Sequence, residues 1–228
     1  VKSWCLPKPS ARFVAKMEDV LSVYQRPYDP RRPQVCLDEI QKALRSTPRG
    51  ALALQPGQPR REDYEYARHG QCSIFLAVEP LAGFRKVWVH ERRTTLDFAH
   101  VLRELADVVY PDTETIVLVV DNLNIHSPAC LYERFEPAEA RRLAEKFEWH
   151  YTPEHASWLN IAECELSVLQ RQTLKARLPD MDTVRTKATA WERRRNERQV
   201  GVDWRFTTED ARIKLKRRYP IVKVQKST

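Results

Sequence analysis

Three carboxylates in this chain of 228 residues occupy positions from which they can share one site. Asp38 and Asp121 each end an apolar run, the second of which covers Thr115–Val120. Glu163 closes the segment Ser157–Glu163, which we interpret as the first two turns of a helix. Two carboxylates at strand ends and a third on a helix can converge on a pair of Mg²⁺ ions, because Mg²⁺ prefers hard oxygen ligands. These positions therefore predict a two-metal site for phosphodiester chemistry.

Each carboxylate also has an ordinary structural explanation. An aspartate at the end of a strand is often a turn residue or a helix cap, and a glutamate on a helix is most often a surface residue. Glu39 and Glu165 lie beside the candidates, but strand alternation should turn Glu39 away from Asp38. Glu165 should also face elsewhere from its helix, so we expect Glu165→Gln to preserve the chemistry of the site.

The cysteine, glycine and hydropathy patterns exclude several classes of protein. The five cysteines are scattered without a C-x-x-C pair, which argues against a disulfide framework and a zinc site. The sequence has neither a phosphate-binding loop of the G-x-x-x-x-G-K-[ST] type nor a dinucleotide fingerprint. It also has no apolar run near the roughly 18 residues that span a bilayer, and no signal-peptide pattern. We therefore expect a protein of a reducing intracellular compartment with no membrane partner.

The net charge of +8 is concentrated at the C-terminal end of the sequence. Residues 171–228 hold 17 Lys/Arg against 7 Asp/Glu, whereas residues 1–170 hold 22 against 24. Such an asymmetry suits a polyanion-binding arm on a less charged core, although a solvated helix face gives the same pattern. The candidate DNA-binding residues belong to two basic runs: Arg193, Arg194, Arg195, Lys214, Lys216, Arg217 and Arg218.

Polar residues beside the three carboxylates suit supporting roles. They follow the second aspartate or precede the glutamate by one turn: Asn122, Asn124, His126 and Asn160. We expect them to orient the metal ligands or to contact DNA, with His126 in a supporting rather than a chemical role. Trp158 is expected to pack in the core rather than to stack on a base.

Hydrophobic periodicity predicts an alternation of strands and helices. Strands are predicted over residues 34–42, 71–78, 84–91, 115–120 and 148–151. Helices are predicted after Ser10, from Thr94 or Thr95 to Pro111, over 129–147 with an interruption near Pro137, from Ser157, and over 180–199. Residues 79–83 suit a hairpin turn, and residues 43–70, rich in Pro, Gly and Arg, are expected to form a long connection.

This order of elements predicts an α/β fold with a mixed sheet and helices on both faces. If the first and fourth strands are neighbours, Asp38 and Asp121 meet at the centre of the sheet, which is the ribonuclease-H-like arrangement. We expect three segments: an N-terminal linker and helix over 1–33, a catalytic core over 34–178, and a basic helical extension over 179–228.

Several segments resemble one known family along essentially the whole chain. They are Trp4–Pro9, Val35–Glu39, Asp63–Tyr66, Asp121–His126, Tyr151–Glu163, Trp191–Asn196 and Trp204–Thr208. These segments are similar to the bacterial insertion-sequence 630 group of transposases, which is related to the mariner superfamily. The motifs around Asp121 and Glu163 carry most of the resemblance.

The resemblance implies an activity, cofactors and partners. Asp38, Asp121 and Glu163 would be the DDE triad of a DNA endonuclease and strand transferase, binding two Mg²⁺ ions for which Mn²⁺ can substitute. The implied partners are transposon ends, target DNA and a second copy of the chain, and the implied location is the bacterial cytoplasm, at the nucleoid. The helix-turn-helix region by which the family recognises transposon ends has no counterpart here, so we expect a fragment with little preference for those ends.

Two other functions remain open from the sequence. One is a different ribonuclease-H-like nuclease, selective for DNA structure, that cuts strands without joining them. The other is a transposase-derived DNA-binding protein that has lost catalysis, although the intact set of three carboxylates argues against it.

Overall fold

The computed structural model describes residues 9–49, 51–52, 57, 61–62 and 64–221. Two parts of the resembling segments lie outside the described residues, namely Asp63 and all of Trp4–Pro9 except Pro9. In the described ranges, no helix is long and apolar enough to cross a membrane.

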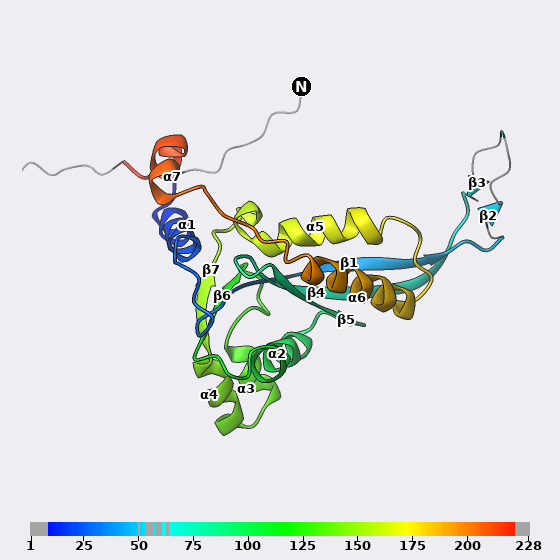
Figure 1. Ribbon diagram of the computed structural model, residues 1–228, viewed down its shortest axis with the longest axis horizontal. Helices are drawn as coiled ribbons and strands as arrows, with labels where there is room; N and C mark the ends of the chain where they lie inside the picture. Colours follow the sequence, from blue (N-terminus) through cyan, green and yellow to red (C-terminus); the bar gives the residue numbers. More distant parts are fainter. Residues whose placement is uncertain (1–8, 50, 53–56, 58–60, 63, 222–228) are drawn as a thin grey trace, which may run out of the picture.

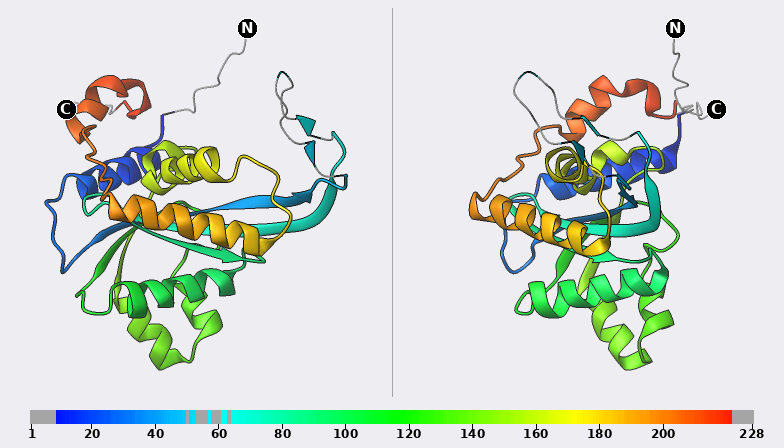
Figure 2. Two further views of the ribbon diagram at one scale, coloured as in Figure 1. Left: turned by 45° about the vertical axis from the view of Figure 1, so that its right-hand side comes forward. Right: turned by 90° about the vertical axis from the view of Figure 1, so that its right-hand side faces the viewer.

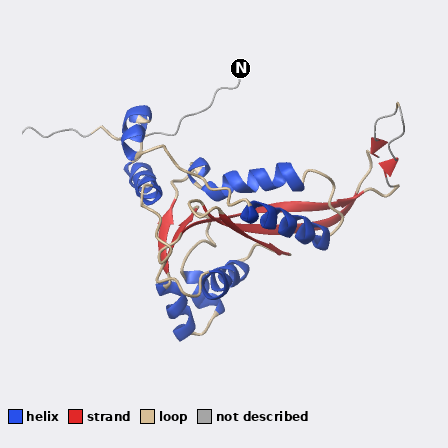
Figure 3. Ribbon diagram, viewed as in Figure 1, coloured by secondary structure: helices blue, strands red, loops and turns tan. Residues whose placement is uncertain are grey.

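A five-stranded mixed sheet lies at the centre of the molecule (Figures 1 and 3). Its strands follow the order β5-β4-β1-β6-β7, with β1 antiparallel to β4, β4 antiparallel to β5, and the pairs β1–β6 and β6–β7 parallel. The bounds are β1 Gln34–Ser46, β4 Ala67–Glu79, β5 Phe84–His90, β6 Ile116–Val120 and β7 Phe147–Tyr151. The β1–β6 pairing confirms the predicted adjacency of the first and fourth predicted strands.

Strands β1 and β4 extend well beyond their predicted ends, so the expectation of a connection over 43–70 is wrong at both ends. Their pairing continues from Ala43↔Gln71, through an irregularity, to Ser46↔Ala67. Two short strands, β2 (Ala51–Leu52) and β3 (Arg61–Glu62), pair beyond them. The first residues of β4 are largely exposed, so this stretch lacks the apolar alternation from which strands are predicted.

Helices cover both faces of the sheet (Figure 2). On one face, α1, α5, α6 and α7 contribute to one hydrophobic cluster; their bounds are Ala11–Tyr24, Ile161–Thr173, Met181–Glu197 and Thr208–Lys214. On the other face, a second cluster joins α2 (Thr95–Glu104), its π-helical continuation η1 (Leu105–Val109), α3 (Ala129–Arg134) and α4 (Pro137–Glu145). Short 3₁₀ turns are formed by η2 (Ser157–Leu159) and η3 (Lys216–Arg218).

Several predicted helix limits are confirmed by capping contacts. The Ser10 side chain accepts a hydrogen bond from Phe13 N at 3.3 Å and starts α1. Thr94 starts α2 with a reciprocal capping box, and α3 and α4 are separate helices on either side of the predicted interruption near Pro137. These starts were predictable because the cap residue and the helical periodicity point to the same position.

The terminal segments pack against the same core as the sheet. Met17 of α1, Trp191 of α6 and Ala211 of α7 are fully buried in one cluster with residues of β1, β4 and β6. The end of α6 also closes on the β4–β5 turn: Gly83 has φ +67°, and a Cβ there would lie 2.5 Å from the Gln199 carbonyl carbon. The three segments expected from the sequence therefore share one hydrophobic interior.

Glu148 of the edge strand β7 binds two arginines, Arg26 and Arg32, from the segment between α1 and β1. Its carboxylate accepts hydrogen bonds from Arg26 Nη1 at 2.7 Å, from His150 Nε2 at 2.9 Å, and from Arg32. Burial raises the pKa of Glu148, but these hydrogen bonds outweigh burial and lower the pKa to about 2.

Glu148→Gln should therefore destabilise the protein above about pH 4.5, and the difference from wild type should shrink as the pH falls towards 2. A carboxyl group whose folded-state pKa is depressed stabilises the fold above its unfolded pKa. That contribution is lost as the pH falls through the folded-state pKa. Thermal melting of both proteins across this pH range checks the prediction, and a difference that does not vary with pH would contradict it.

Candidate active site

The central parallel strands bring Asp38 and Asp121 together on one face of the sheet. The last paired residues of β1 and β6 are Cys36 and Val119, each two residues before an aspartate, so Asp38 and Asp121 lie at the same end of this parallel pairing. Asp38 shares the sheet face of Cys36, because alternate residues of a strand point the same way. Asp38 Oδ1 accepts a hydrogen bond from Glu39 N at 2.8 Å, and Asp121 Oδ1 accepts one from Leu123 N at 2.9 Å.

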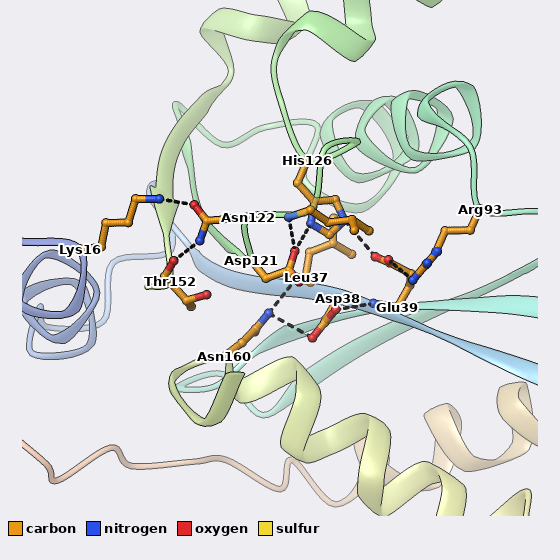
Figure 4. Close-up of polar contacts among 11 residues, drawn as sticks. Lys16, Leu37, Asp38, Glu39, Arg93, Asp121, Asn122, His126, Thr152 and Asn160 are labelled. Carbon is orange, nitrogen blue, oxygen red and sulfur yellow. Dashed lines mark hydrogen bonds and ion pairs between the residues drawn. The ribbon is translucent and has the colours of Figure 1, made fainter. Parts of the chain in front are cut away.

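Glu163 lies in the first turn of α5, and the expectation that this helix runs on from Ser157 is wrong. The 3₁₀ turn η2 ends at Leu159, and Asn160 is extended, with φ −89° and ψ 109°. The Asn160 side chain makes two hydrogen bonds that hold this residue outside the helix. Its Oδ1 accepts from Ala162 N at 3.1 Å and caps α5, and its Nδ2 donates to Leu37 O of β1 at 3.2 Å. Asn160 Nδ2 also lies 3.4 Å from Asp38 Oδ2, so the start of α5 is attached to β1 beside Asp38 (Figure 4).

Burial and charge act on the protonation of Asp38. Burial raises the pKa of Asp38 to about 7, and the negative charges of Asp121 and Glu39 add to this effect. The hydrogen bond from Glu39 N and the charge of His126 act in the opposite direction. A carboxyl group in this environment gains from a nearby cation, because the cation favours its charged form.

The His126 side chain is fully buried and links the Asp121 loop to Glu39 of β1. Its Nδ1 donates to Asp121 Oδ1 at 2.5 Å, and its Nε2 donates to Glu39 Oε2 at 2.9 Å (Figure 4). Burial lowers the pKa of His126, but these two hydrogen bonds outweigh burial and raise the pKa to about 9. Burial would raise the pKa of Asp121, yet the hydrogen bond from His126 and that from Leu123 N lower it.

Glu39 belongs to this network, although sequence reasoning set it aside. It faces away from Asp38, as strand alternation predicted, and contacts His126 and Arg93 on the α2 side of the sheet. Arg93 Nη1 donates to Glu39 Oε1 at 3.2 Å. The sequence offers one signal for this role: a carboxylate at an otherwise apolar, buried position needs a partner.

The other polar candidates have different surroundings. Asn122 accepts a hydrogen bond from Lys16 Nζ and donates one to Thr152 O, which links the Asp121 loop to α1 and to the end of β7. Asn124 is exposed. Trp158 is 43% exposed and stacks on Trp204, so the expectation that it packs in the core is wrong.

The donor set fits a hard divalent cation. Asp38, Asp121 and Glu163 have only carboxylate oxygens to offer, and Glu163 belongs to α5, the helix whose start is attached to β1 beside Asp38. Glu163 Oε2 is buried, and no hydrogen-bond partner for it exists among the described residues. In the described part of the chain, no three His, Cys, Asp or Glu side chains are gathered closely enough to hold a metal ion. Three carboxylates repel one another when no cation lies between them. Binding of a divalent ion would therefore have to bring the three side chains closer together.

The basic residues expected to bind DNA are divided between two places. Arg193, Arg194 and Arg195 lie on α6, which packs along β5, whereas the second basic run lies on α7 and η3 beside α1 (Figures 1 and 2). Lys216 and Arg217 are exposed, Lys214 pairs with Asp210 at 2.9 Å, and Arg218 lies over the Phe13 ring.

Arg195 is in a different position from the one expected. Its Nη2 donates to Glu165 Oε1 at 2.7 Å, while Arg85 Nε donates to Glu165 Oε2 at 3.0 Å. The Glu165 and Arg85 side chains are 6% and 0% exposed. Arg195 is therefore committed to a buried ion pair rather than directed at solvent, while Arg193 and Arg194 remain exposed.

The sheet order and the position of its acidic residues define a ribonuclease-H-like α/β protein. A family model described as "DDE superfamily endonuclease" matches residues 33–185, and the chain belongs to this family. The matched range contains Asp38, Asp121 and Glu163. A comparison with curated proteins finds no match.

Solved structures of a mariner transposase have the same fold. The Mos1 mariner paired end complex with Mn matches with a TM-score of 0.54 and 17% identity, covering 88% of this chain and 62% of that chain. The Mos1 paired end complex with Mg gives 0.53 and 17%, covering 97% and 67%, and the Mos1 strand transfer complex gives 0.54 and 13%, covering 88% and 62%. Similarity at these identities shows the fold, and this chain spans about 62% of the length of the first of these proteins.

Proposed function

We propose that this chain is the catalytic domain of a transposase that cuts DNA phosphodiester bonds and joins the freed ends to new DNA. The observation that carries the proposal is that Asp38 lies on β1 and Asp121 directly follows its parallel neighbour β6, while Glu163 lies in the first turn of α5, whose start is attached to β1. Membership of the DDE endonuclease family supports it, as does the fold shared with the Mos1 transposase complexes.

Asp38, Asp121 and Glu163 would together hold two Mg²⁺ ions, or Mn²⁺ in their place. When bound, such a pair activates the attacking oxygen, first of water and then of a 3′-hydroxyl, and stabilises the leaving oxygen. The chain's own residues orient the ligands. Asn160 holds Asp38 next to the start of α5, and His126 occupies one oxygen of Asp121, which leaves the second for an ion.

The proposed partners are the ends of a transposable element, target DNA and a second copy of the chain. The Mos1 structures are described as paired end and strand transfer complexes, and the excess of basic residues beyond position 170 suits contact with phosphates. The proposed catalytic core covers residues 34–178. Its proposed location is the bacterial cytoplasm, at the nucleoid.

A strand-transfer assay with pre-cut element ends tests the function directly. The protein should join labelled ends to a target DNA when Mg²⁺ or Mn²⁺ is present, and Asp121→Asn should abolish joining. Cleavage without joining would instead identify a nuclease that is selective for DNA structure. DNA binding without either reaction would identify a binding protein that has lost catalysis.

His126→Ala should weaken Mn²⁺ binding by about 10–100-fold, the usual cost of losing a side chain that orients a metal ligand. Without His126, Asp121 Oδ1 keeps only the hydrogen bond from Leu123 N, and Glu39 keeps only the contact with Arg93. Calorimetric titration with Mn²⁺ measures the affinity without relying on turnover. His126→Gln keeps one donor and should fall between the two proteins.

His69→Ala is the matched control, because His69 is exposed on β4, far along the strand from the site. Its affinity for Mn²⁺ should equal that of wild type. Equal affinities for wild type and His126→Ala would show that Asp121 does not depend on the histidine.

A further inference from the structure

A path of two hollows leads from the Asp121 loop to α1. The first hollow has a volume of about 290 Å³ and is lined by Asp121, Asn122, Leu123 and residues 152–157. The second has a volume of about 130 Å³ and is lined by Pro153–His155 together with Ser10, Arg12, Phe13 and Lys16. Because Pro153–His155 line both hollows, the two are neighbours along this segment.

Lys16 stands where the two hollows meet. Its Nζ donates to Asn122 Oδ1, so the residue next to Asp121 holds a lysine that comes from α1 (Figure 4). The same ammonium group lies 5.8 Å from the centre of the Tyr151 ring. Asn122 is itself fixed by its hydrogen bond to Thr152 O. A cation is thereby positioned at the edge of the candidate active site.

The charges along the path favour an anion. Arg12 and Lys16 line the same hollow; burial lowers the pKa of Lys16, and the positive charge of Arg12 lowers it further. Glu154 acts in the opposite direction and is the acidic side chain of this wall. An anion between Arg12 and Lys16 would relieve their repulsion.

We propose that this path holds the sugar–phosphate backbone of the DNA strand that leads away from the scissile phosphate, with Arg12 and Lys16 as its phosphate contacts. The assignment rests on the proposed function, since it takes Asp121 as part of the reacting centre. The path starts at that centre, and its second hollow is lined by two cations, Arg12 and Lys16, against one carboxylate, Glu154. A phosphodiester backbone carries one negative charge per nucleotide, so it can occupy both hollows with successive charges.

The salt dependence of DNA binding tests the assignment. Arg12→Gln, Lys16→Gln and the double variant should each bind a labelled oligonucleotide duplex more weakly in EDTA. The log–log slope of affinity against salt should fall by up to about one unit for each cation removed. Glutamine has a helix propensity close to that of Lys and Arg, so α1 should persist, and thermal melting verifies this. Glu154→Gln should act in the opposite direction and tighten binding.

Arg141→Gln is the matched control, because Arg141 is an exposed cation of α4 that pairs with Glu145. It should leave the slope unchanged. In cleavage assays with Mg²⁺, the double variant should raise KM more than it lowers kcat, since it loses contacts to the strand rather than to the reacting atoms.

Different results would overturn the DNA path and the proposed function. A double variant with the slope and KM of wild type, beside an active wild type, would overturn the DNA path alone. A slope that falls equally in Arg141→Gln would also overturn it. A wild type that neither cuts nor joins DNA would overturn the proposed function.

Discussion

Glu163→Gln should lower Mg²⁺-dependent DNA cleavage by roughly a thousandfold or more, while the fold and DNA affinity stay close to wild type. The amide has nearly the shape of the carboxylate, so the buried packing of Leu159 and Leu166 beside it should survive. The substitution removes the negative charge that would hold a divalent ion. Losing several kcal/mol of transition-state stabilisation corresponds to about three orders of magnitude in rate. Cleavage rate, melting temperature and DNA affinity are measured on the same preparation.

Glu133→Gln is the control for that change, because Glu133 is an exposed carboxylate of α3. It should retain the cleavage rate of wild type. Asp121→Asn should resemble Glu163→Gln, and the double variant should be little worse than either, since ligands that act as a unit do not contribute additively. Substantial Mg²⁺-dependent cleavage by Glu163→Gln would mean that the third ligand is another residue.

Glu165→Gln should destabilise the fold by about 3–5 kcal/mol, the usual cost of breaking a buried ion pair by removing one partner. The sequence predicts only that this substitution preserves the chemistry of the site, and the structure adds an expected loss of stability. Glu165 joins Arg85 of β5 to Arg195 of α6, and the Arg85 side chain is fully buried. Without the carboxylate, Arg85 becomes a buried cation with no compensating charge. Denaturant unfolding gives the free energy of unfolding of each protein.

A double substitution separates lost charge from lost packing. Glu165→Leu combined with Arg85→Met should recover part of the stability lost in Glu165→Gln, because an apolar pair of similar volume often replaces a buried ion pair without cost. A free energy of unfolding for Glu165→Gln within about 0.5 kcal/mol of wild type, the range of ordinary surface changes, would show that the ion pair does not stabilise the fold.

The sequence predicts those parts of the site that depend on local pattern. Ile116–Val120 is apolar throughout, and the structure buries every residue of β6, so Asp121 follows a buried central strand as the sequence predicts. Ser10 and Thr94 cap helices where periodicity begins. In such positions, the local preference of the residue and the tertiary structure agree.

The sequence does not predict contacts between distant residues. His126 and Glu39 are 87 positions apart, and Arg85 and Glu165 are 80 positions apart. No local pattern distinguishes a buried, paired glutamate on α5 from a surface one, so the sequence predicts only that Glu165 faces away from Glu163 and does not predict its ion pair. Asn160 was interpreted as helical for a similar reason: it breaks the helix because Leu37 O, far away in the sequence, accepts its hydrogen bond.

The parallel pairing of β1 with β6 has a consequence for the order in which the protein is made. β1 can form a hairpin-like pair with β4 as soon as residue 79 has been synthesised, but its parallel neighbour arrives some forty residues later, and α5 follows β6. Contacts between residues so distant in sequence form late in folding. During synthesis, the chain thus carries Asp38, the first residue of the proposed active site, long before the other two proposed ligands are made. A ribosome-bound fragment that ends before α5 has no Glu163, so the proposed active site can be complete only once nearly three quarters of these residues have been joined.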